Sequence, residues 1–450
     1  MDLAIGFGVF LFALIAGVAA GLPVIYPVLL GMVCFGCIAL HRGFSFNAVL
    51  KMAFSGIKRS LVVLRIFLFI GLMTALWRAS GVIPFLVYYS VQLINPQFFL
   101  LFCFLITTLI SYLLGTSFGT VGTIGVVLIV LAKSGGVSLP LTAGAIISGA
   151  YFGDRSAPTS SCANLVAALT DTSIYSNVKK MLKQSLLPLA LTAALFGLFS
   201  LAHPLPTMQS DVMDELATSF SLHWTLLIPA CIVPLLSLCK VKVSYAMLSS
   251  ILLSAVLAWI LQGMSPLAIL KTAIWGFTME GPGKLPAILS GGGFVSMISV
   301  SLLILVSSTY SGIFEGTDML RQVERLLERI TLRLGRFPSL CLSSVFANMA
   351  ACNQTLAVIL VQQLYAPIYR SQGKSNQDLA LDISNSAVTI AGLIPWSVAC
   401  AVPLAILGVT SAAVPYCAYL YLVPLCALGE SYFEKRRGNK AALSHKAMDE

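Results

Sequence analysis

The chain consists mainly of long apolar runs separated by short polar segments. Eight of these runs have about the ~20 residues that a helix needs to cross the ~30 Å hydrocarbon core of a bilayer. They lie near residues 3–20, 22–40, 61–79, 184–202, 223–239, 242–262, 293–313 and 414–429. The first run ends in small residues, but no basic segment precedes it and a second run follows at once, which favours a retained helix over a cleaved signal. The pattern predicts an all-α polytopic membrane protein.

Four further stretches are apolar but interrupted by polar residues, glycine and proline. Residues 97–132 and 338–368 must each return to the side they left, as re-entrant hairpins do, whereas 138–172 and 377–412 must each cross once. Because roughly 35 helical residues at ~1.5 Å each are too long for one straight crossing, the last two stretches are expected to be broken transmembrane helices. By length, the sequence predicts about ten crossings plus two re-entrant hairpins.

The composition excludes most soluble classes of protein. Of 450 residues, 58% are hydrophobic and only 10% are charged, and the mean hydropathy is +0.93. So few charges cannot cover a water-exposed surface, which excludes a soluble enzyme, a disordered chain and a secreted disulfide scaffold. The net charge of +10 comes from Lys and Arg between apolar runs, where membrane proteins keep their cytoplasmic loops positive. We therefore expect a lipid bilayer, and no nucleic acid, as the partner.

The basic residues also predict an orientation. With residues 42–59 placed in the cytoplasm, the later basic clusters fall on the same side and the acidic loop of Asp211, Asp214 and Glu215 falls outside. Both termini are then cytoplasmic, as in a multi-pass protein of a bacterial cell (inner) membrane. The later clusters are Lys179 to Lys183, Arg321 to Arg336, Arg370 with Lys374, and Lys435 to Arg437. Residues 319–336 would place apolar side chains on one face of a helix and arginines on the other, which predicts an amphipathic surface helix.

The chain resembles itself at a constant offset of 237 residues. Gly115-Thr116-Ser117-Phe118 aligns with Cys352-Asn353-Gln354-Thr355, and Pro158-Thr159-Ser160 aligns with Pro395-Trp396-Ser397. The two halves begin on opposite sides by the charge count, so we predict an inverted-topology repeat. The predicted division is an N-terminal helical hairpin with a basic loop (1–60), repeat 1 (61–202), connecting loop and helices (203–292), repeat 2 (293–430) and a basic tail (431–450).

Inverted repeats with interrupted helices are a recurring design of secondary transporters, whose substrates bind near the midplane at the interruptions. Irregular backbone is tolerated at that depth only where it is buried in protein or lines a wet cavity. The breaks therefore predict the site. The alternative is that Gly115-x-x-x-Gly119 and Gly149-x-x-x-Gly153 only let helices pack closely. The number of polar side chains around these glycines favours a binding site over helix packing alone.

Asp154 is the main chemical feature of the first half. A carboxylate inside a membrane helix costs about 2.5–3.5 kcal/mol on insertion scales, so a compensating role is expected. It can hold a proton and exchange it for a metal cation, here Na⁺; the alternative is a structural bond that holds the break. Arg155 could instead hold an anionic substrate group. The other candidate ligands of the first half are Thr116, Ser117, Thr120, Ser156, Thr159, Ser160, Ser161 and Asn164.

The second half offers only neutral oxygens and amides at its breaks. They suit a partly dehydrated sodium ion or a small organic zwitterion, and none of them can carry a proton. Asp378 and Asp382 come near the start of the broken crossing, where solvated or interfacial roles are commoner. No H-E-x-x-H motif or complete P-loop is present, so we expect no enzyme, no cofactor and energy from an ion gradient. The candidate ligands of the second half are Asn353, Gln354, Thr355, Asn385 and Ser397.

At these residues the chain resembles the NhaC-type sodium/proton antiporter family, within the larger group of transporters with two inverted halves and re-entrant hairpins. The resemblance runs from about residue 60 to 430 and rests on residues 115–120, on Leu141 to Asp154, and on Leu393-Ile394-Pro395-Trp396-Ser397. It implies that Asp154 and its hydroxyl neighbours form the cation and proton site, with Asn353 and Asn385 opposite.

Three departures from the family pattern affect the expected activity. Family members tend to carry acidic residues where this chain has Ser161 or Cys162, Asn353 and Asn385. With fewer titratable groups, the chain is also similar to relatives thought to move organic acids or amino acids.

Two hypotheses follow from this reading. The first is Na⁺/H⁺ (or Li⁺/H⁺) antiport by alternating access with Asp154 as the titratable carrier. The second is ion-coupled transport of a small organic acid or amino acid on the same fold. A third class is a channel, which predicts currents far above carrier turnover, or an intramembrane enzyme, which needs a catalytic pair that the sequence does not offer. A homodimer is compatible with the sequence.

Overall fold

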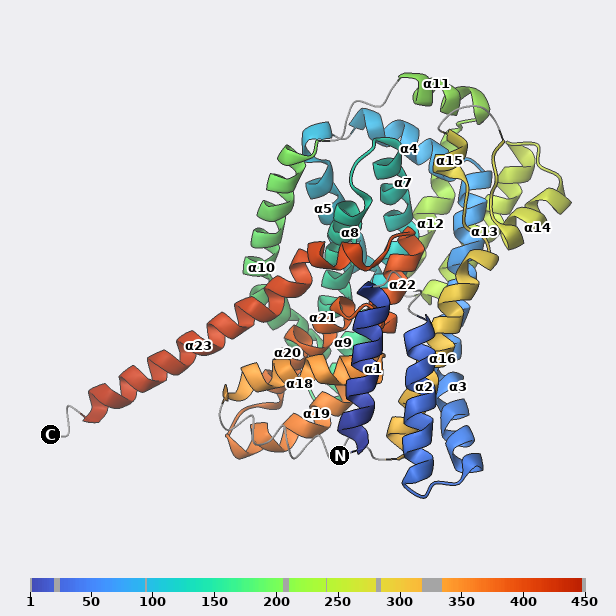
Figure 1. Ribbon diagram of the computed structural model, residues 1–450. Helices are drawn as coiled ribbons and strands as arrows, with labels where there is room; N and C mark the ends of the chain where they lie inside the picture. The colour runs from blue at the N-terminus through green and yellow to red at the C-terminus, as the bar shows by residue number, and fades with distance from the viewer. Residues whose placement is uncertain are drawn as a thin grey trace.

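The computed structural model describes residues 2–19, 25–93, 95–204, 210–239, 241–280, 285–317 and 334–446. Within these ranges the chain is all-α, and extended pairing is limited to one isolated bridge between Phe277 and Gly291. Figure 1 shows the helices gathered in one bundle, from which the C-terminal helix reaches outward. Nearly all of the predicted surface helix at 319–336 lies outside the described residues.

The first part of the chain runs to the end of α10. Its helices are α1 (Asp2–Ala19), α2 (Ile25–His41), α3 (Phe46–Ala79), α4 (Val82–Leu93), α5 (Phe99–Leu114), α6 (Ser117–Thr120), α7 (Val126–Ser134), α8 (Leu139–Ser156), α9 (Ser161–Leu169) and α10 (Ile174–Ala202). A 3₁₀ turn at Pro96–Phe98 precedes α5, and a π-helical turn at Val121–Gly125 joins α6 to α7.

The rest of the chain begins with shorter helices. It comprises α11 (Ser210–Ser219), α12 (Leu227–Leu238), α13 (Val243–Ile260), α14 (Pro266–Trp275), α15 (Leu285–Leu289), α16 (Ile298–Gly316), α18 (Arg336–Ala351), α19 (Gln354–Ser371), α20 (Asn376–Asn385), α21 (Ala387–Ile390), α22 (Val398–Leu407) and α23 (Ala418–Lys446). Short 3₁₀ turns occur at Trp224–Leu226, Val295–Met297, Ala391–Leu393 and Ser411–Tyr416.

Several helices are long and apolar enough to cross a membrane. Among the described residues there are five such helices, or seven if each of two bent pairs counts as one span. The bent pairs are Leu64–Ala79 with Val82–Tyr89, at 67°, and Asn376–Leu393 with Val398–Leu407, at 49°. The five are Pro96–Leu114, Ser117–Ser134, Ile174–Ala202, Val243–Ile260 and Val295–Phe314. The protein is therefore a multi-pass membrane protein, while the count of ten crossings stays a prediction.

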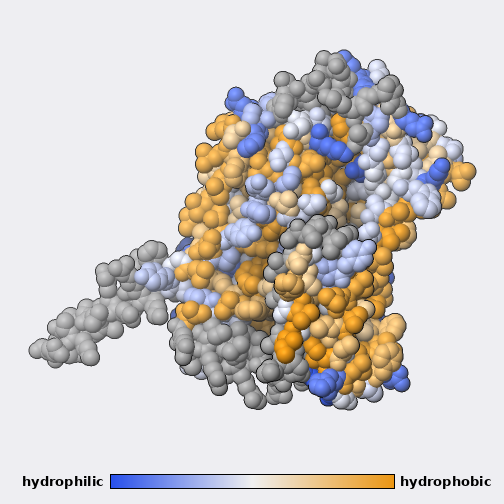
Figure 2. Space-filling view, viewed as in Figure 1, coloured by the Kyte–Doolittle hydropathy of each residue, from blue (hydrophilic) through white to orange (hydrophobic). Residues whose placement is uncertain are grey.

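The surface has the polarity of a membrane protein. Large apolar side chains such as Phe12, Leu186 and Leu198 are 63–75% exposed. In Figure 2 hydrophobic residues cover much of the middle of the face in view, and the most hydrophilic ones gather toward its upper and lower ends. Charged residues such as Asp154 and Arg155 are instead buried. Because lipid covers apolar side chains, this distribution leaves the interior for the polar chemistry.

Two glycines bring α5 and α8 into backbone contact beside the candidate site. A Cβ atom at Gly149 would lie 2.7 Å from the carbonyl oxygen of Phe104, and one at Gly153 would overlap the carbonyl group of Ser111. The Ser111 hydroxyl accepts a hydrogen bond from the Gly153 N–H at 3.1 Å and donates one to the carbonyl oxygen of Ala150. This close packing, typical of small residues in membrane helices, holds the end of α8 that carries Asp154.

Candidate functional site

The first break of each half has the same local structure. α5 ends at Gly115 and α18 ends at Cys352, both in the left-handed conformation, with φ of 66° and 50°. Thr116 and Asn353 follow in extended conformation and cap the next helices, accepting the N–H groups of Gly119 and Leu356. A side-chain cap satisfies backbone N–H groups that a helix start leaves without partners. The offset of 237 residues is kept at each of these positions.

The second break of each half is also matched. α8 ends at Ser156, and α9 begins after Ser160, whose hydroxyl accepts the N–H groups of Cys162 and Ala163 at 3.1 and 3.2 Å. Ser397, 237 residues later, accepts the N–H of Ala399 at 3.4 Å and caps α22. Pro158 and Pro395 come two residues before these caps. A residue that precedes proline avoids the helical region, which explains why both helices stop there.

The two breaks of each half touch one another. In the first half, a Cβ atom at Gly115 would lie 2.7 Å from the backbone nitrogen of Ser160, so only glycine fits this approach. In the second half, the Val398 N–H donates to the carbonyl oxygen of Cys352 at 2.9 Å. The Tyr151 hydroxyl then joins the halves by donating to the carbonyl oxygen of Ala399 at 2.6 Å. The helix starts at Ser117, Ser161, Gln354 and Val398 therefore belong to one contiguous region.

Asp154 lies where the two halves meet. Its side chain is 7% exposed, and its carboxylate accepts the backbone N–H of Ser117 at the start of α6. It also accepts the side-chain amide of Gln354, from the start of α19, at 3.3 Å. The same amide nitrogen donates to the carbonyl oxygen of Val388 at 3.0 Å. One carboxylate thus receives donors from a break of each half.

Arg155, the next residue, points to different partners. It is 1% exposed, and its Nε and Nη2 atoms donate to the side-chain oxygen of Asn385, the former at 3.2 Å. Its Nη1 atom donates to the hydroxyl oxygens of Ser185 at 2.5 Å, Ser156 at 3.0 Å and Tyr419 at 3.4 Å. Within the described residues no carboxylate pairs with this guanidinium. It is a buried positive charge held by neutral oxygens.

The site contains one carboxylate and many neutral oxygens. In the described part of the chain, no three His, Cys, Asp or Glu side chains cluster as metal ligands. A cation bound here would therefore be held by Asp154 together with hydroxyl, amide and carbonyl oxygens. Such hard oxygen ligands suit an alkali ion better than a transition metal.

The sequence profile of the Na⁺/H⁺ antiporter family matches residues 149–433, which include Asp154 and both breaks of the second half. The chain belongs to the Na⁺/H⁺ antiporter family. The predicted resemblance to NhaC-type antiporters is thereby confirmed.

Proteins similar to this antiporter chain are named for different substrates. The chain is 29% identical to a malate-2H⁺/Na⁺-lactate antiporter of Bacillus subtilis (strain 168), over 80% of this chain and 78% of that protein. It is 28% identical to the Na⁺/H⁺ antiporter NhaC of the same organism, over 91% and 92% of the two chains. It is also 22% identical to the arginine/ornithine antiporter ArcD of Halobacterium salinarum (strain ATCC 700922 / JCM 11081 / NRC-1), over 87% and 82%.

In this antiporter, the other residues predicted for the site fall into four groups. Ser117, Gln354 and Ser160 contact Asp154 directly, the last through a 2.5 Å hydrogen bond to its carbonyl oxygen. Ser156 and Asn385 contact Arg155 instead. Thr116, Asn353 and Ser397 cap helices at the breaks, and Thr120 donates to the Thr116 carbonyl oxygen. Thr159, Ser161, Asn164 and Thr355 are exposed near the breaks.

Three further residues of the site are not predicted from the sequence. Tyr151 joins the halves, and Ser185 and Tyr419 bind Arg155 from α10 and α23. Tyr151 falls within the stretch that carries the family resemblance, which could have indicated it. Ser185 follows Lys183 and Gln184 at the start of an apolar run, and Tyr419 lies among other tyrosines, so no pattern in the sequence marks either as a site residue.

Proposed function

We propose that the protein exchanges Na⁺, or Li⁺, for protons by alternating access, with Asp154 as the titratable carrier. The observation that carries this proposal is the placement of one buried carboxylate against donors from a break of each half. Since Na⁺ and a proton compete for the same carboxylate, binding of one releases the other. Movement of the halves relative to each other would expose the site to the two sides of the membrane in turn.

The remaining predicted ligands belong to this proposal. Neutral oxygens of Thr116, Ser117, Asn353 and Gln354 complete a cation shell around Asp154, and the exposed hydroxyls of Thr159, Ser161 and Thr355 line its approach. Arg155 adds a fixed positive charge close to the carrier. That charge limits the net charge that the empty carrier buries.

We also infer that residues 61–202 and 293–430 are two repeats of opposite orientation. The equal spacing of the four breaks and their matched caps support this inference. The regions 1–60, 203–292 and 431–450 would then flank and connect the repeats, with both termini in the cytoplasm of a cell whose inner membrane holds the protein, alone or as a homodimer.

The experiment that tests the antiport proposal measures cation-induced proton movement in proteoliposomes. Na⁺, Li⁺ and K⁺ are added to vesicles with a preset pH gradient, for the wild type and for Asp154→Asn. We expect Na⁺ and Li⁺ to collapse the gradient only with the wild type. Asp171→Asn is the matched control, because Asp171 is exposed in a left-handed turn that asparagine also adopts. A wild type that does not respond to any of the three cations would refute the proposal.

A second candidate is ion-coupled exchange of a small organic acid or amino acid. The convergence of four helix starts favours it, because their positive ends attract carboxylates. The malate/lactate and arginine/ornithine antiporters to which the chain is similar also favour this candidate. Arg155 would then act on the anion through its charge, since neutral side chains already occupy its donors. Counterflow of labelled lactate, malate or arginine into preloaded proteoliposomes would distinguish this candidate from pure Na⁺/H⁺ exchange.

A further inference from the structure

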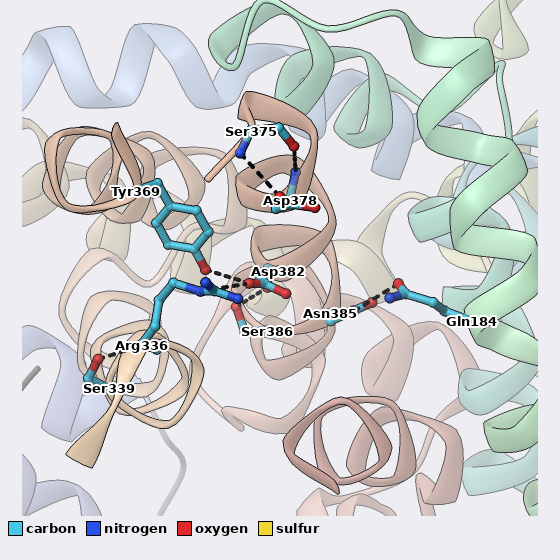
Figure 3. Close-up of polar contacts among 9 residues, drawn as sticks. All are labelled: Gln184, Arg336, Ser339, Tyr369, Ser375, Asp378, Asp382, Asn385 and Ser386. Carbon is cyan, nitrogen blue, oxygen red and sulfur yellow. Dashed lines mark hydrogen bonds and ion pairs between the residues drawn. The ribbon is translucent and has the colours of Figure 1, made fainter. Parts of the chain in front are cut away.

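Three side chains join α18, α19 and α20, as Figure 3 shows. The carboxylate of Asp382 on α20 accepts a 2.5 Å hydrogen bond from the Tyr369 hydroxyl on α19. It also pairs with Arg336 at the start of α18, with 3.8 Å between Nε and Oδ2. The Arg336 guanidinium lies over the Tyr369 ring, 4.9 Å from its centre. We call these three residues the α20 clamp.

The α20 clamp is shielded from water, so its charges interact strongly. Tyr369 is 1% exposed, and the side chains of Arg336 and Asp382 are 19% and 17% exposed. An exposed ion pair contributes little, but a pair that also has a charge-assisted hydrogen bond and a cation–π contact is held in one geometry. Loss of any one member removes one contact from each of the other two.

The same short helix also contacts Arg155, the neighbour of Asp154. Three residues after Asp382, the side-chain oxygen of Asn385 accepts the Arg155 Nε–H group. The amide nitrogen of Asn385 donates to the side-chain oxygen of Gln184 on α10 at 3.2 Å. Figure 3 shows the clamp and the Asn385–Gln184 pair on opposite sides of α20. α20 is therefore fixed between the α18–α19 hairpin, through the clamp, and α8 with α10, through Asn385.

The clamp exists in one half of the molecule only. At the offset of 237 residues, Arg336, Tyr369 and Asp382 correspond to Phe99, Ala132 and Ala145, all of which are buried and apolar. The glycines that bring α5 and α8 together, Gly149 and Gly153, correspond to Ser386 and Ile390. The first half thus has close backbone packing where the second half has polar side chains.

We propose that Arg336, Tyr369 and Asp382 are positioning residues of the transport site. By fixing α20 to the α18–α19 hairpin, they set where Gln354 lies against Asp154 and where Asn385 lies against Arg155. This inference rests on the proposed role of Asp154. A ligand shell must be held within a fraction of an ångström, so release of the clamp weakens cation binding more than it slows the carrier.

The test measures the Na⁺ dependence of exchange in proteoliposomes for clamp variants. Asp382→Asn removes the charge but keeps an acceptor for Tyr369, and Tyr369→Phe removes the hydroxyl but keeps the ring under Arg336. We expect apparent KM for Na⁺ to rise about tenfold in the first and about threefold in the second, with maximal rates within about threefold of wild type. Arg336→Lys keeps the charge, and its apparent KM for Na⁺ should lie between those of Tyr369→Phe and the wild type.

Asp378→Asn is the matched control for Asp382→Asn. Asp378 lies one helical turn earlier on α20 and only accepts the Ser375 N–H, in an exposed capping box at 3.1 Å. We expect its KM and rate to equal those of the wild type. Arg336→Asp and Asp382→Arg should each raise the apparent KM for Na⁺. The double variant, which restores the ion pair with its charges exchanged, should bring KM most of the way back to the wild-type value. A normal KM in Asp382→Asn, an equal change in Asp378→Asn, or a double variant no better than the singles would overturn the proposal.

A thermal-unfolding cycle separates failure of the clamp from failure of the antiport proposal. Arg336→Gln, Asp382→Asn and the double variant are melted in detergent, where no transport is needed. A Tm loss in the double variant smaller than the sum of the single losses supports the clamp, and additive losses refute it. If the cycle shows coupling but wild-type vesicles do not exchange Na⁺ for protons, only the antiport proposal fails, and the KM comparison moves to the solute that is carried.

Discussion

Ser111 and Asn348 occupy equivalent places in the two halves. The Ser111 hydroxyl donates to the carbonyl oxygen of Ala150, and the Asn348 amide donates to that of Ala387 at 3.0 Å. Each acceptor lies 39 residues after its donor, and each donor lies one turn before its break. A side-chain bond therefore ties each hairpin to the broken helix of its own half, next to the residues proposed to bind the cation.

Removal of the Gln354 amide should weaken cation binding. In Gln354→Leu, Asp154 loses the donor that lies 3.3 Å from Oδ2, and the shell loses an oxygen. We expect apparent KM for Na⁺ to rise about tenfold, the equivalent of ~1.4 kcal/mol. Proteoliposome exchange at graded Na⁺ concentrations measures it. Gln363→Leu is the control, because Gln363 lies on the same helix but is exposed; an equal rise in the control would contradict the assigned role of Gln354.

A methyl group at Gly153 should separate α5 from α8. Since a Cβ atom there would overlap the carbonyl group of Ser111, Gly153→Ala forces the two helices apart. Overpacking of this kind costs about 1–3 kcal/mol, and the shift also moves Asp154, so both stability and exchange should fall. Gly36→Ala, where no atom lies within 4 Å of the added group, should melt like the wild type in a detergent thermal-shift assay. Equal melting of the two variants would argue against the close contact.

Loss of the cap at Asn353 should loosen the start of α19. Asn353 accepts the N–H groups of Thr355 and Leu356 at 2.9 and 3.4 Å. Asn353→Ala should lower stability by about 1 kcal/mol, whereas Asn353→Asp keeps the cap and should remain near wild type. Thermal shift provides the measurement. Similar losses in the two variants would show that the cap is not the reason for asparagine at this position.

Replacement of Arg155 by lysine should be poorly tolerated even though the charge is kept. Lysine cannot reach Asn385, Ser185 and Tyr419 together, because it lacks the planar fork of donors. We expect a loss of about 1–3 kcal/mol in thermal unfolding, since buried acceptors lose charged donors. Arg370→Lys, on an exposed position of α19, is the control and should not change Tm. A wild-type Tm for Arg155→Lys would mean that these hydrogen bonds do not stabilise the helix interruption after Arg155.

Periodicity and composition were sufficient to predict a multi-pass, all-α membrane protein. Apolar runs of membrane length can be recognised without tertiary information, because the bilayer sets the helix length. The positions of the helix interruptions could also be predicted from the sequence, because glycine, proline and capping residues act on the backbone next to them. The structure has the helix ends where Gly115, Pro158, Cys352 and Pro395 indicated them. The importance of Asp154 could be inferred because a carboxylate is costly among apolar residues.

The contacts of these residues depend on how the helices pack in three dimensions. Adjacent in sequence, Asp154 and Arg155 face different elements of the second half, Gln354 on α19 and Asn385 on α20. Polar residues such as Ser185 and Tyr419 acquire partners from helices far away in the chain. The physical reason is that local patterns depend on backbone and solvent, whereas the partner of a buried polar group depends on which helices pack together.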